Sequence, residues 1–204
     1  HKESLLNQYH QLNAIKEYNV DAKSMGDRNL KHRCLEMLAH LGTNDVEELV
    51  LNKFMSSTNM TDEFSSLNTI IHSSSKNREY VLKSFYEKWK HETLVMQKWL
   101  SAQAIDSSDE TYLNVLKLEY DEVYDRSVPN LVRSLFGSFA RNYLQFHHES
   151  GRGYRLLCDK IIELDPQNPS MASRLASAFT DYKRLPQHLQ LLMKKELESV
   201  LDVH

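Results

Sequence analysis

Glycine, proline and long hydrophobic runs are scarce in this sequence. The 204 residues include 5 Gly and 4 Pro, which are few for a fold with many tight β-turns and favour helices joined by short connections. No apolar stretch approaches the roughly 20 residues that span a bilayer, and no signal-peptide pattern opens the chain. We therefore expect no membrane partner and a cytoplasmic protein.

An excess of charge of one sign is also lacking. Lys and Arg number 25 and Asp and Glu number 28, which gives a formal net charge of -3. Because nucleic-acid backbones require a basic surface, no nucleic-acid partner is expected. Apolar residues make up 41% of the sequence, which is ordinary for a globular protein. A chain of this length can bury a hydrophobic core without disulfides or structural metal ions.

The sequence contains two cysteines and no complete metal-binding or catalytic motif. Cys34 and Cys158 lie within predicted amphipathic helices, which indicates small core residues in a reducing compartment rather than a disulfide. The segment from His91 to Val95 starts like the zinc motif HExxH, but the second histidine is replaced by Val95. Two adjacent histidines, His147 and His148, do not converge naturally on one metal, so a solvated loop is expected there. We expect no metal site and no catalytic residue in this chain.

Apolar residues instead recur at helical spacing along nearly the whole sequence. A helix is predicted at about residues 22–41, with Gly42 as its C-terminal stop. Its predicted apolar face consists of Leu30, Cys34, Leu35, Leu38 and Leu41.

Capping signals mark the starts of several other predicted helices. Thr61 or Asn59 can cap a helix that carries Phe64, and Asn168 precedes Pro169 as a cap followed by a first-turn proline. Pro129 also fits a first helical turn, and Ser107 with Glu110 resembles a capping box. The pattern predicts an all-α fold of about ten or eleven helices. Short links make neighbouring helices antiparallel, so we expect an irregular helical solenoid or superhelix of stacked helix pairs in a single domain, residues 1–204.

Two longer segments resemble bacterial aminopeptidase N. Residues 85–104 read FYEKWKHETLVMQKWLSAQA and resemble the family stretch FYxxWxxxxLVMxKWxxxQA, and residues 129–140 read PNLVRSLFGSFA and resemble PNxxRSLxGxFA. The likeness continues, in the family's order, at Asn59-Met60-Thr61-Asp62, Phe146-His147, Gly151, Gly153-Tyr154, Asp165, Asn168-Pro169 and Ala172-Ser173-Arg174-Leu175.

The resemblance implies a non-catalytic, C-terminal helical domain of a zinc aminopeptidase. In that family another domain binds zinc and removes N-terminal amino acids from peptides, and the helical domain covers it as a lid that limits substrate access. The implied partners are the catalytic domain of the same parent chain and peptide substrates. Arg133 and Arg174 match family positions that line the substrate cavity, where a guanidinium can bind a peptide carboxylate.

Two other interpretations remain open. The chain begins with His1 inside a helical pattern, which favours a fragment of a larger protein over a free-standing helical scaffold that binds peptides or proteins in a groove. An independent hydrolase that uses the histidine cluster is the third interpretation. The fragment hypothesis predicts a surface rich in apolar residues where the catalytic domain docks.

Overall fold

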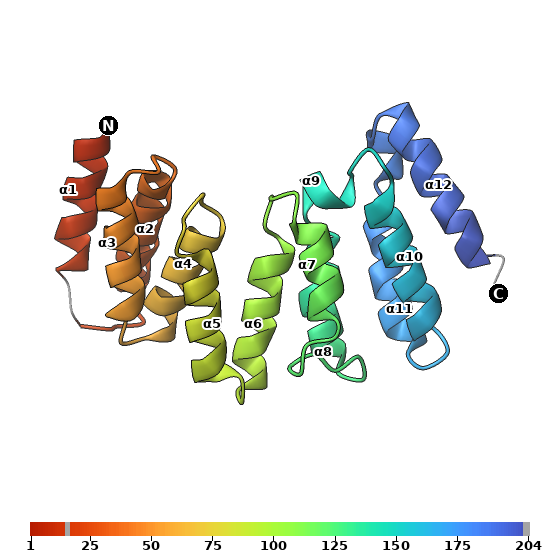
Figure 1. Ribbon diagram of the computed structural model, residues 1–204, viewed down its shortest axis with the longest axis horizontal. Helices are drawn as coiled ribbons and strands as arrows, with labels where there is room; N and C mark the ends of the chain where they lie inside the picture. Colours follow the sequence, from red (N-terminus) through yellow and green to blue (C-terminus); the bar gives the residue numbers. More distant parts are fainter. Residues whose placement is uncertain (15–16, 202–204) are drawn as a thin grey trace. The chain divides into compact units, whose positions relative to one another are not determined.

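The computed structural model describes residues 1–14 and 17–201, and the regular secondary structure of these residues is helical throughout (Figure 1). The α-helices are α1 (Lys2–Asn13), α2 (Ala22–Ala39), α3 (Asn44–Met55), α4 (Met60–Ile71), α5 (Arg78–Trp89), α6 (Thr93–Ala104), α7 (Thr111–Leu118), α8 (Pro129–Val132), α9 (Tyr143–Phe146), α10 (Arg152–Leu164), α11 (Pro169–Ala176) and α12 (Gln187–Leu201). A π-helical turn, η1 (Arg133–Gly137), and two 3-10 turns, η2 (Ser177–Phe179) and η3 (Tyr182–Arg184), complete the set. The predicted all-α fold is confirmed, and the described residues contain twelve α-helices, slightly more than the ten or eleven expected.

The residues that were expected to end or cap helices do so in most cases. Gly42 follows α2 with a φ of 60°, a left-handed conformation that glycine adopts without steric cost. The side chain of Asn59 accepts a hydrogen bond of 2.9 Å from the backbone N–H of Asp62 at the start of α4. Asn168 caps α11 in the same way, with Pro169 as the first helical residue.

The predicted capping box at Ser107 and Glu110 is wrong. Helix α7 begins at Thr111, and Glu110 precedes it without a side-chain cap. The carboxylate of Asp106 instead accepts a hydrogen bond of 2.8 Å from Ser108 Oγ, and the hydroxyl groups of Ser108 and Thr111 lie 3.1 Å apart. The polar groups before α7 are therefore satisfied by a local network that centres on Asp106.

The described chain divides into two compact units, residues 1–88 and residues 89–204. In the first unit α1 packs on α2, α3 packs on α4, and α2 also contacts α4. The core of this unit includes Cys34, Leu35, Leu38, Val50, Leu67, Ile70, Val81 and Phe85. Leu30 and Leu41 were expected on the buried face of α2, but they are 48% and 49% exposed. That prediction is wrong because the buried stripe of α2 includes Lys31 rather than Leu30, and because α2 ends at Ala39, so that Leu41 lies in the turn after the helix.

In the second unit α10 packs on both α11 and α12, and α6 packs on η1 and α7. The core contains a cluster of aromatic rings in which the centroids of Phe146 and Tyr154 lie 5.2 Å apart, and those of Phe146 and Phe179 lie 5.6 Å apart. The Phe146–Tyr154 pair is edge-to-face, and such ring pairs contribute stability beyond the area that they bury.

A buried asparagine joins the end of α6 to the start of α9 in this second unit. The side-chain amide of Asn142 donates hydrogen bonds to the backbone carbonyl groups of Ala104 and Asp106, at 3.1 and 2.6 Å. Its Oδ1 accepts a bond from the backbone N–H of Gln145. One side chain thus satisfies three backbone groups in the interior, where an unpaired polar group is costly.

Candidate functional site

A π-helical turn positions the first of the two arginines that the sequence indicated. Pro129 starts α8, which continues directly into η1, and Arg133 is the first residue of η1. The guanidinium of Arg133 donates a hydrogen bond of 3.0 Å to Asn130 Oδ1. A Cβ atom on Gly137 would lie 3.3 Å from Cγ of Arg133, so glycine at this position leaves room for the arginine stem. Such π-turns occur frequently at functional sites.

Arg133 and Arg174 line the same cleft in the second unit. The cleft has a volume of about 230 Å³, and a third arginine, Arg141, also lines it. The rest of the wall is formed by Gly137, Ala140, Met171, Leu175, Ser177 and Ala178. Arg174 lies in the last turn of α11, and Arg141 donates a hydrogen bond of 3.1 Å to Ser138 Oγ. Three elements, η1, the segment after it, and α11, therefore bring three guanidinium groups to one small cleft.

The electrostatic character of this arginine cleft favours an anion. Its lining contains no Asp or Glu, and within the part of the chain that the structure describes none of the three arginines forms an ion pair. A guanidinium binds a carboxylate through two parallel hydrogen bonds, which gives both affinity and orientation. Arg174 also has a structural role, because positive charge in the last turn of a helix interacts favourably with the helix dipole. Arg133 and Arg141 each donate one hydrogen bond to a neutral side chain, so their charges have no counter-ion among the described residues.

The sequence indicated Arg133 and Arg174 but not Arg141. The two predicted residues lie on separate helical segments, and the structure brings them together at the arginine cleft. Their assignment to the substrate cavity of a parent enzyme stays a prediction. Arg141 directly follows the segment at residues 129–140 that carries the family resemblance, so its position in the chain was the one available signal.

The other histidine and cysteine positions that the sequence singled out are His91, Cys34 and Cys158. His91 is exposed, and Val95 occupies the position where the zinc motif requires a histidine. Among residues 1–14 and 17–201, no group of three or more His, Cys, Asp or Glu side chains is placed to hold a metal ion. Cys34 and Cys158 are free and buried, as predicted.

His147 lies in the turn after α9, in agreement with the predicted loop, but it is only partly solvated. Its Nδ1 lies 2.9 Å from the hydroxyl of Tyr154, and its ring centroid lies 5.0 Å from that of Phe146. Burial lowers the pKa of His147 below its ordinary value of 6.5. The residue packs in the aromatic cluster because α9 ends directly before it and turns the imidazole toward α10.

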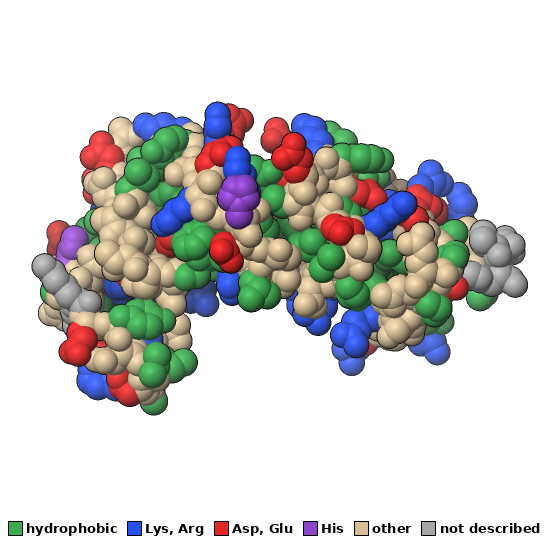
Figure 2. Space-filling view, turned by 90° about the horizontal axis from the view of Figure 1, so that it is seen from below, with side chains coloured by type: hydrophobic (Ala, Val, Ile, Leu, Met, Phe, Trp, Pro, Cys, Tyr) green, Lys and Arg blue, Asp and Glu red, His purple; other side chains and the backbone are tan. Residues whose placement is uncertain are grey.

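The surface of the chain is mixed in character on the face that Figure 2 shows. Hydrophobic side chains lie there in small groups between charged and polar ones (Figure 2). No helix in the described part of the chain is long and apolar enough to cross a membrane. The apolar docking surface that the fragment hypothesis requires is not apparent on this face and stays a prediction.

Comparisons with known proteins relate the chain to aminopeptidases. Aminopeptidase N of Haemophilus influenzae is 35% identical over 188 residues, which are 91% of this chain and 21% of that protein. Aminopeptidase N of Caulobacter vibrioides is 32% identical over 186 residues, which are 91% of this chain and 22% of that protein. The chain thus spans about a fifth of the length of these curated relatives.

A solved structure shares the fold. The crystal structure of Legionella pneumophila aminopeptidase A in complex with aspartic acid matches 99% of this chain and 25% of that chain, with a TM-score of 0.92 and 27% sequence identity. The helical architecture defines an ARM-repeat-like domain. The chain belongs to the family described as a domain of unknown function (DUF3458_C) with ARM repeats, whose model matches residues 1–204.

Proposed function

We propose that this chain is the C-terminal domain of an aminopeptidase N-type zinc peptidase, which removes N-terminal amino acids from peptides. The proposal is supported by relatives named Aminopeptidase N, in which the matching segment is about a fifth of the protein. Zinc and the catalytic residues belong to another domain of the parent protein, and this chain supplies neither. Its two free, buried thiols fit a reducing, cytoplasmic location.

The domain acts as a lid that encloses the active-site cavity and limits the access of substrates. One observation carries this role: the arginine cleft presents three guanidinium groups that no acidic residue of the described chain neutralises. A short peptide whose N-terminus lies at a zinc site carries a free carboxylate at its other end. Arg133 and Arg174 bind that carboxylate and thereby select short peptides with an accessible C-terminus.

The test uses the complete protein that contains this chain, with Arg133→Ala, Arg174→Ala and the double variant. The substrates are an alanyl tripeptide with a free C-terminus and the same tripeptide as its amide. Loss of a charge-assisted hydrogen bond costs about 1.5–3 kcal/mol, so kcat/KM for the free peptide should fall about tenfold or more, while hydrolysis of the amide stays unchanged. Arg155→Ala is the matched control, because Arg155 is an exposed arginine of the same unit that pairs with Glu196.

The two substrates separate the possible outcomes. Equal loss on both substrates would mean that the arginines maintain the fold rather than bind the carboxylate. Unchanged kinetics on both would reject their role in substrate selection.

The lid role itself is tested by mixing the purified chain with the remainder of its parent protein and an alanyl chromogenic substrate. Gain of activity or altered selectivity only in the mixture is the expected result. Hydrolysis by this chain alone that a chelator abolishes would contradict the proposal. If neither the chain nor the mixture changes peptide hydrolysis, a free-standing peptide-binding scaffold becomes the better interpretation.

A further inference from the structure

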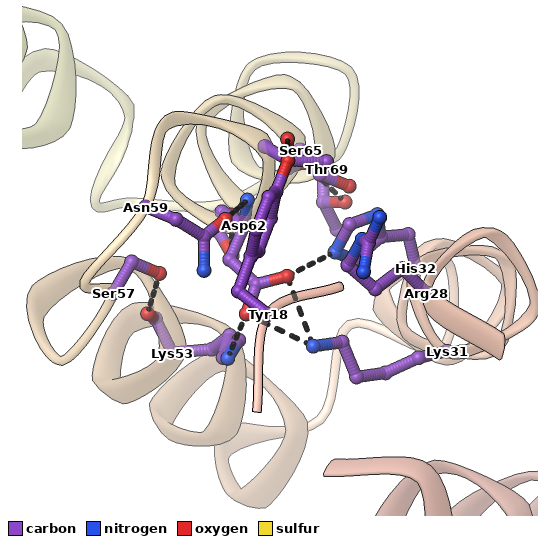
Figure 3. A network of polar contacts seen from close by, with 12 residues as sticks. Tyr18, Arg28, Lys31, His32, Lys53, Ser57, Asn59, Asp62, Ser65 and Thr69 are labelled. Atoms are coloured by element: carbon purple, nitrogen blue, oxygen red, sulfur yellow. Dashed lines mark hydrogen bonds and ion pairs between the residues drawn. The ribbon is translucent and has the colours of Figure 1, made fainter. Parts of the chain in front are cut away.

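A buried carboxylate in the first unit is shared by three basic side chains (Figure 3). Asp62, in the first turn of α4, has a side chain that is 8% exposed. Lys31 Nζ lies 2.9 Å from each of its carboxylate oxygens, and Lys53 Nζ lies 2.6 Å from Oδ2. His32 Nε2 lies 2.7 Å from Oδ1. Helices α2 and α3 thus contribute two lysines and a histidine to one negative charge.

The charges of this Asp62 cluster do not balance. Burial opposes ionisation of Asp62, but the hydrogen bonds from His32, Lys53 and Lys31 outweigh it and hold its pKa well below the usual range. Burial also lowers the pKa of Lys31, against the attraction of Asp62. The single carboxylate therefore neutralises one of two buried ammonium groups, and a positive charge remains.

Hydrogen-bond donors also remain. An ammonium group has three N–H donors. Lys31 directs two of them at Asp62 and Lys53 directs one, and no other acceptor in the described chain takes the rest. The two lysine side chains are only 5% and 12% exposed. Because N–H groups in a partly buried site are stabilised by an acceptor, these donors are available to bind an additional acceptor.

A cavity of about 480 Å³ lies next to the cluster and gives that acceptor room. Lys31, Lys53, Asp62 and Arg28 all line it. Arg28 is held by stacking on the Tyr18 ring, at 4.3 Å from its centroid, and by a hydrogen bond to the carbonyl of Asn19. The remaining wall includes the neutral polar residues Asn13, Ser24, Ser56, Thr58 and Asn59.

The acidic residues of the cavity limit the charge of a ligand. Asp27 lines the cavity, but its carboxylate pairs with Lys23 at 2.6 Å. Glu17 is the other carboxylate on the wall besides Asp62. The cavity wall thus contains three cationic side chains, Arg28, Lys31 and Lys53, and two carboxylates without another partner, Glu17 and Asp62. One positive charge is left over, and a ligand with one negative charge would neutralise it. A polyanion would meet the carboxylates of Glu17, Asp27 and Asp62 and be repelled.

We propose that the cavity binds a small monocarboxylate, whose oxygens accept hydrogen bonds from Lys31 and Lys53. The volume lies within the range of sites for small molecules. The carboxylate matches the surplus charge, and the neutral polar wall accommodates a short organic acid. Phosphates and dicarboxylates carry more negative charge than the single surplus positive charge can neutralise. The carboxylates of Glu17, Asp27 and Asp62 therefore exclude them by repulsion.

Titration of the complete protein with sodium acetate, at ionic strength kept constant with sodium chloride, tests the site. Thermal unfolding and calorimetry should show saturable binding of acetate and none of acetamide, its neutral counterpart. Lys53→Met should weaken acetate binding at least tenfold. The matched control is Lys83→Met, which alters an exposed lysine on α5 of the same unit and should leave the affinity unchanged.

The Asp62→Asn variant should change the affinity for acetate in the direction opposite to Lys53→Met. Asp62 competes with a bound carboxylate for the same ammonium groups, so its neutralisation should strengthen acetate binding, and acetate should recover part of the stability that the variant loses. An internal ion-pair network without a ligand predicts no response to acetate in either protein, and that result would overturn the proposal. Tighter binding of inorganic phosphate or succinate than of acetate would reject the monocarboxylate class.

Discussion

At the residue scale, His147 shows how a polar side chain packs in a cluster of aromatic rings. It contacts the rings of Tyr143, Phe146 and Tyr154, and one of its nitrogens is bonded to the hydroxyl of Tyr154. The surroundings thus accept a neutral imidazole and penalise a charged one, which is why burial lowers its pKa.

The stability of the protein should therefore depend on the protonation of His147. The unfolded chain binds a proton at His147 below about pH 6.5, whereas the folded state resists it, so this stabilising contribution is present above pH 6.5 and is lost as pH falls toward the lowered pKa. His147→Gln should flatten this part of the curve of unfolding free energy against pH. Denaturant unfolding between pH 5 and 8 measures it, with exposed His188→Gln as control. Parallel curves for the His147→Gln variant and the unmodified protein would contradict the assignment.

Single residues of α2 also show how far the spacing of apolar residues predicts burial. The spacing of apolar residues identified Cys34, Leu35 and Leu38 as buried, and each is at most 3% exposed. The same pattern included Leu30, which lies on α2 and is 48% exposed, and Leu41, which lies after the end of the helix and is 49% exposed. A helical pattern gives the direction of the apolar face but not its width, because the width depends on which other helices pack against it.

At the scale of elements, helices α9 and α10 approach each other at Gly153. A Cβ atom there would lie 2.4 Å from the carbonyl oxygen of Phe146 and 2.9 Å from that of Gln145. Both contacts are with backbone, which cannot rotate away as a side chain can. Glycine at this position is therefore required by the packing of α10 against the end of α9.

Gly153→Ala should destabilise the protein by about 3 kcal/mol or more, since overpacking against backbone must displace a helix. Gly26→Ala is the matched control, because nothing lies within 4 Å of the added methyl group; it should leave stability unchanged or raise it by up to about 1 kcal/mol. Chemical denaturation of both variants measures the difference. Similar free energies of unfolding for the two variants would refute the close approach of α9 and α10.

The candidate sites were predictable only to the extent that they depend on local sequence. Arg133 and Arg174 came from segments that resemble a known family, and Arg141 beside them was missed. Of the Asp62 cluster, only Asp62 lies in a segment that resembles the family, and nothing in the sequence connects it to Lys31 and Lys53, because the three residues belong to three different helices. Residues far apart in the chain meet only through tertiary packing, which neither periodicity nor short motifs encode.

At the scale of the whole molecule, each compact unit contains one buried thiol. Cys34 lies in the first unit and Cys158 in the second, and both are nearly inaccessible. Burial raises the pKa of both thiols, that of Cys158 to about 12. Since the thiolate is the reactive form, each cysteine is protected by burial and by protonation, and each reports on its own unit.

Pulse labelling with a thiol reagent at pH 8 should leave both cysteines unmodified in the native protein and label both in strong denaturant. Mass spectrometry of the peptides then gives a separate midpoint for each unit. One shared midpoint would support the single-domain prediction for residues 1–204, whereas two midpoints would mean that the units unfold independently. Fast labelling of either cysteine without denaturant would contradict its buried position.

The π-turn at Arg133–Gly137 also affects how this segment tolerates changes in length. A π-turn accommodates one residue more than an α-helix does in the same axial space. Deletion of Ser134 would let the segment continue as a regular α-helix and keep the chain after it in place. A relative with one residue fewer here would thus preserve the surrounding packing but change which side chains of the turn face the arginine cleft. We expect length variation at this point to change the occupant of the arginine cleft without changing the fold.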